Sequence, residues 1–177
     1  MTTAFRLAAL ALLALAACED APQSSLIDMR VQSARDFLIN ASKEGPVLVE
    51  LLGEPLAGGG KLDRMDFAAL VGSTFGAEPW IKMTADKATA AQPDFRLIWV
   101  VDPVAWLAPD AACQGKAASG PVRRAERVEM RAYFCSEQRT LSAVQGSVKR
   151  PARSDDTRWQ QLVRQMSRQL VGNRVSG

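Results

Sequence analysis

The chain has 177 residues, 47% of them hydrophobic and 23% charged, which suits one folded domain and excludes wholesale disorder. Its 22 Lys and Arg against 19 Asp and Glu give a formal net charge of +3. The absence of histidine excludes a Ser-His-Asp triad, a Cys-His pair, a histidine zinc site and a histidine proton shuttle.

The first 17 residues have the pattern of a secretory signal peptide. Arg6 supplies the short positive region, and an unbroken run of Leu and Ala follows from Leu7 to Ala17. This run of 11 residues is much shorter than the roughly 20 residues that cross a bilayer as a permanent helix. We therefore expect residues 1–17 to direct export and to be removed.

The end of this run carries a lipidation signal. Leu15-Ala16-Ala17-Cys18 closely resembles the lipobox of bacterial lipoproteins, in which small residues precede a cysteine. The resemblance implies cleavage before Cys18, a thioether-linked diacylglycerol on its sulfur and acylation of its new amine. Several acyl chains hold a protein on a membrane essentially permanently. The alternative is an ordinary signal peptide with an incidental cysteine.

The same resemblance implies a cellular location and a division of the mature chain into a tether and a domain. Residues 18–25 are polar and include Pro22, so they are interpreted as a tether, and residues 26–177 are interpreted as a single periplasmic domain. In the family, acidic residues just after the cysteine can favour retention in the inner membrane. Glu19 and Asp20 are not the strongest form of that signal, so the outer membrane is favoured.

The first half of the domain alternates helix and strand. Apolar residues spaced by four and three predict a helix over Leu26–Ser42, which Gly45 and Pro46 end. The apolar run Val47–Leu52 predicts a strand buried on both faces. Asp63 is the expected N-cap of a second helix.

The second half is expected to contain most of the sheet and a closing helix. A short strand is expected over Trp80–Thr84, and the β-branched and aromatic run Phe95–Val101 predicts a strong strand. A loop follows over Ala105–Pro121. Alternating residues over Glu126–Cys135 predict a half-solvated strand, with Thr140–Val148 as its hairpin partner.

The last predicted element is a helix over Asp155–Val171, with its acids at the N-terminus and Gly172-Asn173 after its end. Core periodicity favours burial of Trp99 and Trp159. Together the elements predict an α+β two-layer sandwich. In it, a mostly antiparallel sheet of four to five strands is packed by two to three helices.

Two cysteines remain once Cys18 is assigned to lipid. Cys113 and Cys135 are predicted to form a disulfide, because disulfides persist in an oxidising compartment. Closing that 23-residue loop contributes about 3.4 kcal/mol in the chain-entropy model. A redox pair is the alternative, but the Cys-x-x-Cys spacing that lowers a thiol pKa is absent.

No motif for catalysis, metal or cofactor binding is complete. Gly58-Gly59-Gly60-Lys61 resembles a phosphate loop, but Pro55 stands where its first glycine is required and Leu62 replaces the Ser or Thr. No pair of carboxylates is placed on one face by its spacing. We therefore expect no catalytic residue, no metal and no cofactor.

Charge is concentrated at the C-terminal end. From Gln138 onward there are eight Lys or Arg and two Asp, whereas residues 18–137 are net negative. The candidate partner-binding residues are Arg158, Arg164 and Arg168, together with the loop residue Trp106. They would meet lipid headgroups, a cell-wall polymer or an acidic protein. The alternative for the arginines is a solvated helix face, and export argues against nucleic acid.

The order of elements is similar to that of small periplasmic lipoprotein domains, namely lipoprotein activators of penicillin-binding proteins and TolB N-terminal-like domains. The similarity spans about 125 residues, and the cysteine pair departs from it. It implies a non-catalytic binding or assembly factor of the cell envelope. The alternatives are a carrier of a small lipophilic ligand and a carboxylate-dependent hydrolase.

Overall fold

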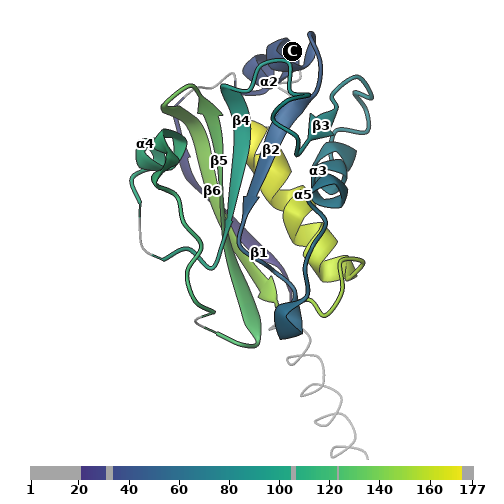
Figure 1. Cartoon of the computed structure of the whole chain (residues 1–177), viewed down its shortest axis with the longest axis vertical. Coiled ribbons are helices and arrows are strands. Elements are labelled where there is room, and N and C mark those ends of the chain that lie inside the picture. The colour runs from purple at the N-terminus through teal and green to yellow at the C-terminus, as the bar shows by residue number, and fades with distance from the viewer. Residues whose placement is uncertain (1–20, 31–33, 105–106, 123, 173–177) are drawn as a thin grey trace, which may run out of the picture.

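The computed structural model describes residues 21–30, 34–104, 107–122 and 124–172 (Figure 1). Its strands are β1 (Gln23–Met29), β2 (Val47–Leu52), β3 (Met83–Thr84), β4 (Phe95–Val101), β5 (Arg127–Ser136) and β6 (Arg139–Lys149). Its helices are α2 (Ala34–Ser42), α3 (Arg64–Ser73), α4 (Pro109–Ala111) and α5 (Thr157–Val171), with a 3-10 turn η1 (Ala57–Gly59) and a π-helical segment η2 (Ala112–Lys116).

The six strands form one mixed sheet in the order β1-β6-β5-β4-β2-β3. The pairs β1–β6, β6–β5 and β5–β4 are antiparallel, whereas β2 is parallel to both β4 and β3. The α+β class is therefore as predicted. The prediction of a mostly antiparallel sheet of four to five strands is wrong. The unpredicted edge strand β1 brings the sheet to six strands, and the two parallel pairs of β2 make it mixed.

The edge strand β1 corrects the predicted helix Leu26–Ser42, of whose described residues only Ala34–Ser42 are helical. The segment before it pairs with β6 instead, with Gln23 opposite Ser147 and Met29 opposite Ser142. β1 also includes Gln23–Ser25, the last residues of the expected tether. Pairing with a strand more than a hundred residues away supplies main-chain hydrogen bonds that local periodicity does not report.

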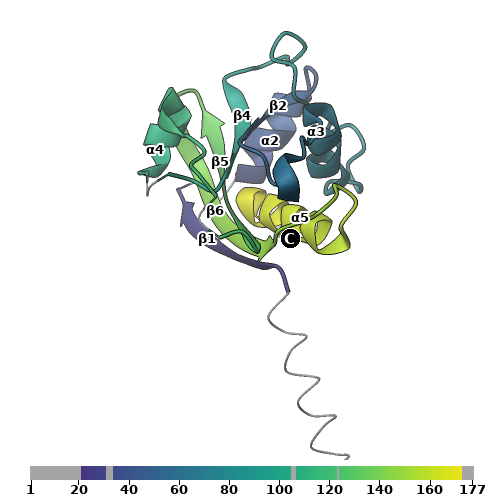
Figure 2. The same ribbon diagram turned by 60° about the horizontal axis from the view of Figure 1, so that its bottom comes forward.

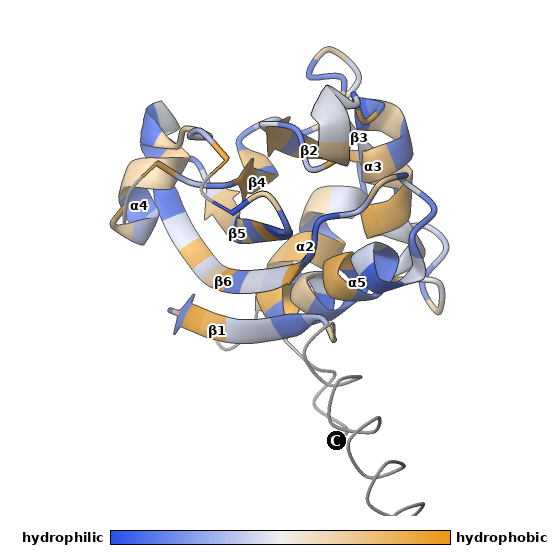
Figure 3. Cartoon of the chain, turned by 90° about the horizontal axis from the view of Figure 1, so that it is seen from below, coloured by the Kyte–Doolittle hydropathy of each residue, from blue (hydrophilic) through white to orange (hydrophobic). Residues whose placement is uncertain are grey.

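Three helices, α2, α3 and α5, cover one face of the sheet (Figures 1 and 2). The main core lies between these helices and the sheet, and Figure 3 shows the apolar inner sides of α2 and α5. At its centre Phe67 packs edge-on against Trp99, with ring centroids 5.4 Å apart, and lies 6.2 Å from Trp159. The predicted burial of Trp99 and Trp159 is confirmed.

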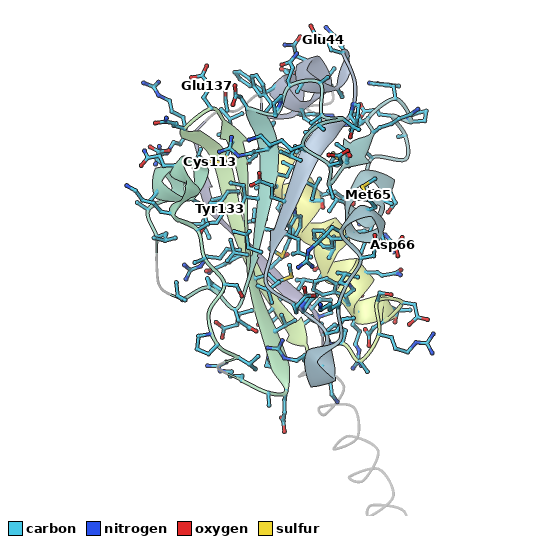
Figure 4. All side chains as sticks on the ribbon, viewed as in Figure 1. Glu44, Met65, Asp66, Cys113, Tyr133 and Glu137 are labelled. Carbon is cyan, nitrogen blue, oxygen red and sulfur yellow. A yellow bond between two sulfur atoms is a disulfide. The ribbon has the colours of Figure 1, made fainter. Side chains whose placement is uncertain are left out.

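The opposite face, called the outer face below, carries a smaller apolar core under α4 and η2. Its buried residues include Ile98, Val100 and Tyr133. The predicted disulfide between Cys113 and Cys135 attaches η2 to β5 at this place, on the side of the sheet where Figure 4 labels Cys113 and Tyr133. α4 and η2 form within the segment Ala105–Pro121 that was expected to be a loop.

Side-chain caps fix the ends of two helices. The Asp63 carboxylate accepts hydrogen bonds from the backbone N–H groups of Met65 and Asp66 and so begins α3, as predicted. Asp156 caps α5 in the same way through Arg158 and Trp159. The caps set where α5, and therefore its outward face, begins.

Candidate functional site

α5 turns its arginines away from the core. Its buried residues Trp159, Leu162, Met166 and Leu170 follow one face, whereas Arg168 is exposed and Arg164 lies one turn before it. The whole helix contains no Asp or Glu. The outward face of α5 is thus cationic along its length, with Arg158 at its first turn.

The hydrogen bonds of these arginines leave the outward face charged. Arg164 donates from Nη2 to Gln160 Oε1 over 3.4 Å, and Arg168 donates from Nε to the Arg164 carbonyl over 3.3 Å. Arg158 lies 3.5 Å from a carboxylate oxygen of the N-cap Asp156. Arg164 and Arg168 bond within the helix and therefore keep their charge for an external anion.

The basic C-terminal region is otherwise not a single patch. The Arg150 side chain is 5% exposed and pairs with Asp102, and Arg153 pairs with Asp155 next to it. Trp106 and Cys18 lie outside the described residues. The predicted cationic surface is therefore reduced to the three arginines of α5.

A shallow groove joins this surface to the start of the fold. It has a volume of about 620 Å³ and is lined on one side by Pro22, Gln23 and Ser24 and on the other by Gln165, Arg168 and Gln169. Figure 2 shows β1 and α5 side by side there. The point where β1 begins is therefore next to the exposed arginine of α5.

A second hollow, the polar trough, lies on the outer face and was not predicted from the sequence. It measures about 440 Å³, and the side chains that give it its polar character are Gln23, Ser25, Glu129, Arg131, Gln145 and Ser147. Three strands contribute to it, because Ser25 is opposite Gln145, and Gln145 is opposite Arg131. Gln23 and Ser25 had been assigned to the tether, so the sequence did not bring these residues together.

Hydrogen bonds organise the trough. The Gln145 amide donates to the Ser25 hydroxyl over 3.3 Å, and Arg127 Nη2 donates to the Ser147 hydroxyl over 3.1 Å. Pro103 lines the trough, and the next residue, Val104, is 41% exposed. The trough therefore offers hydroxyl, amide, carboxylate and guanidinium groups on a rigid sheet, beside an exposed apolar side chain.

The pKa values of Asp110 and Tyr133, both on the outer face, are shifted. The backbone N–H of Thr140 and then the Arg30 guanidinium lower the pKa of Asp110, to which they donate at 2.8 and 2.7 Å. Burial raises the pKa of the Tyr133 hydroxyl, against a smaller opposing effect of Arg131. Asp110 thus ties α4 to the start of β6 and to the residue after β1.

The glycine-rich loop is a turn in the structure. The backbone N–H of Gly60 bonds to Ala57, and the N–H of Leu62 donates to the Glu54 carboxylate over 3.1 Å. Glu54 also pairs with Arg64 over 2.6 Å. Because the Glu54 carboxylate accepts the Leu62 N–H, this backbone donor is not directed at a phosphate, and the loop does not form a phosphate cradle here.

The part of the chain that the structure describes contains no cluster of three His, Cys, Asp or Glu that could hold a metal. No helix among these residues is both long and apolar enough to span a membrane. Comparisons with protein-family models, with curated proteins and with solved structures found no match.

Proposed function

We propose that this chain is a membrane-anchored periplasmic lipoprotein, held by acyl chains on Cys18, that acts as a non-catalytic binding or assembly factor in the cell envelope. The lipobox supports the anchor. The observation that carries the binding role is the polar trough, in which three adjacent strands present hydrogen-bonding side chains to solvent. A polar, partly charged surface of this kind suits a reversible protein partner.

Rigidity supports this proposal. A binding surface on paired strands loses little conformational entropy when a partner docks. β6 is paired on both sides, with β1 and with β5, and β5 is paired with β4. Gln145 and Arg131 therefore project from interior strands of the sheet, whereas Gln23 and Ser25 come from the edge strand β1.

The two candidate surfaces lie on opposite faces of the sheet. The α5 arginines are on the helix-covered side, and the trough is on the outer face. An anchored molecule could therefore present one surface to its support and the other to a partner. Trp106 follows Val104 by two residues and remains a candidate contact for that partner.

The space between sheet and helices favours this proposal over a lipophilic carrier. Phe67, Trp99 and Trp159 pack there against one another. The hollow between α3 and α5 measures about 190 Å³ and includes Asp66, Asp155 and Gln160 in its lining. It is small for a ligand site, since ligand pockets usually exceed about 300 Å³.

Site-specific photo-crosslinking in living cells tests the proposal. A photoreactive residue in place of Gln145, at the centre of the trough, should capture one reproducible envelope protein that mass spectrometry identifies. The same residue at the exposed Gln138 of the β5–β6 turn is the control and should not capture it.

A blocking variant adds specificity. Ser25→Tyr places a ring in the trough at an exposed strand position and should abolish the crosslink at Gln145, whereas Ser154→Tyr in an exposed loop should leave it intact. Equal capture from Gln138 and Gln145, or capture insensitive to Ser25→Tyr, would contradict binding in the trough.

A further inference from the structure

We infer that the outward face of α5 docks on the anionic lipid headgroups of the membrane in which Cys18 is anchored. Arg164 and Arg168 are its principal contacts. The inference rests on the proposed anchoring and names the partner of the α5 surface. The polar trough opens on the other face of the sheet but borders the groove beside α5, because Gln23 and Ser24 line both hollows.

The first argument is the short connection between anchor and fold. Gln23 is already paired with Ser147 and is the fifth residue after Cys18. Five residues span at most about 17 Å, even when fully extended. An acylated Cys18 lies at the headgroup layer, so the start of β1 cannot stand farther than this from the lipid.

The second argument is the position of the cations. Arg168 and Gln165 line the groove that Pro22, Gln23 and Ser24 complete. The residues nearest the anchored end therefore include an exposed arginine whose hydrogen bond stays within its own helix. Arg164, one turn earlier on the same face, adds a second charge.

The third argument is the sign and size of the attraction. α5 has arginines and no carboxylate, so its outward face complements an anionic leaflet. A basic residue near such a surface strengthens binding about fivefold. Free in solution, so few charges bind weakly. An anchor a few residues away raises the effective lipid concentration and makes weak contacts sufficient to orient the domain.

Vesicle binding by an unlipidated chain isolates the contribution of α5. Every residue of both apolar cores lies between Ile27 and Val171, so residues 18–177 with Cys18→Ser contain the whole fold. With lipid in large excess, so that weak binding is detected, a measurable fraction of this chain should sediment with vesicles of phosphatidylcholine and phosphatidylglycerol but not with phosphatidylcholine alone, and added salt should release it.

The matched variants separate the patch from overall charge. Arg164→Gln with Arg168→Gln should weaken partitioning onto the anionic vesicles roughly 30-fold. Lys43→Gln with Arg139→Gln removes the same charge from exposed positions and should leave partitioning within about twofold. Lys43 and Arg139 are close in sequence to Glu44 and Glu137, which lie at the upper end of Figure 4, whereas β1 begins at the lower end in Figure 1. The control charges are therefore far from the anchored end.

Equal partitioning of the two double variants, or equal binding to both kinds of vesicle, would overturn the inference. Loss of a crosslinked envelope protein in the Arg164→Gln, Arg168→Gln variant, with unchanged vesicle binding, would assign the arginines to an acidic protein and overturn it as well. The intact mass of the membrane-extracted chain reports acylation of Cys18 independently. Failure of the anchor is thus distinguished from failure of the α5 contact.

Discussion

Arg150, just after β6, donates from Nη2 to Oδ2 of Asp102, just after β4, over 2.7 Å, and each side chain is only 5% exposed. The same guanidinium group bonds to the Arg127 carbonyl over 3.0 Å, and Asp102 Oδ1 accepts from the Glu129 N–H over 3.2 Å. The pair thereby joins the ends of β4, β5 and β6. An arginine of the basic C-terminal region therefore serves the fold.

Removing one charge of this pair should be costly. Asp102→Asn keeps a residue that tolerates the positive φ of 44° but leaves the Arg150 guanidinium buried without its counter-ion. We expect a loss of about 3–5 kcal/mol in the free energy of unfolding, measured by urea denaturation. Arg153→Ala, in a pair that is 79% and 63% exposed, should cost about 1 kcal/mol or less. Similar losses in both variants would contradict a structural role for the buried pair.

The disulfide should stabilise the fold and keep the outer core covered. In a Cys18→Ser background, Cys113→Ser with Cys135→Ser should lower the free energy of unfolding by about 3.4 kcal/mol. Hydrogen exchange should increase in α4 and η2, since their link to β5 is lost. The Cys18→Ser chain without the other changes is the control. Unchanged exchange in α4 and η2 would show that packing alone holds them on the sheet.

Gly146 allows β1 and α5 to approach β6 closely. A Cβ atom at this position would lie 2.8 Å from the Gln23 carbonyl oxygen, from Leu162 Cδ1 and from Met166 Sδ. Gly146→Ala should therefore cost about 1–3 kcal/mol of stability in thermal or urea unfolding. Gly76→Ala, whose Cβ would meet only the Ser73 carbonyl oxygen at 3.6 Å, should be neutral or slightly stabilising. Equal effects would mean that β1 and α5 have room to shift.

Acid should weaken the attachment of α4. The folded pKa of Asp110 is lowered, so its ionised form stabilises the fold fully above the unfolded pKa of about 4. That contribution is lost as the pH falls through the folded pKa. Asp110→Asn should therefore be less stable than the natural chain at neutral pH, and the difference should shrink on acidification. Unfolding free energies measured across the acid range test this, and a difference independent of pH would contradict it.

The sequence predicted those elements whose information is local. The apolar run of β2, the alternation of β5 and the Asp63 cap all report short-range geometry, and the structure contains each of them. The predicted half-solvated character of β5 is wrong in its second half, because Tyr133 and Cys135 are buried under α4 and η2. The helix predicted over Leu26–Ser42 was wrong over Leu26–Met29, which belongs to β1. Ile27 and Val31 fit helical spacing, yet residues up to Met29 gain more from pairing with β6.

The candidate surfaces depended on the same long-range pairing. The arginines of α5 could be proposed from composition and periodicity, because they lie on one amphipathic helix. The trough could not, since Ser25, Arg131 and Gln145 become neighbours only through the pairing of three strands. The burial of Arg150 was equally hidden, because its partner Asp102 lies 48 residues away. Spacing along a chain does not report which charges meet across a sheet.

The intact mass of the chain extracted from the membrane fraction tests the central proposal most directly. We expect a chain that begins at Cys18 and carries the added mass of a diacylglycerol and an amide-linked acyl chain. Cys18→Ser should abolish that species. A soluble chain cleaved elsewhere and free of lipid, or one that keeps residues 1–17, would contradict membrane anchoring and remove the basis for the orientation assigned to α5.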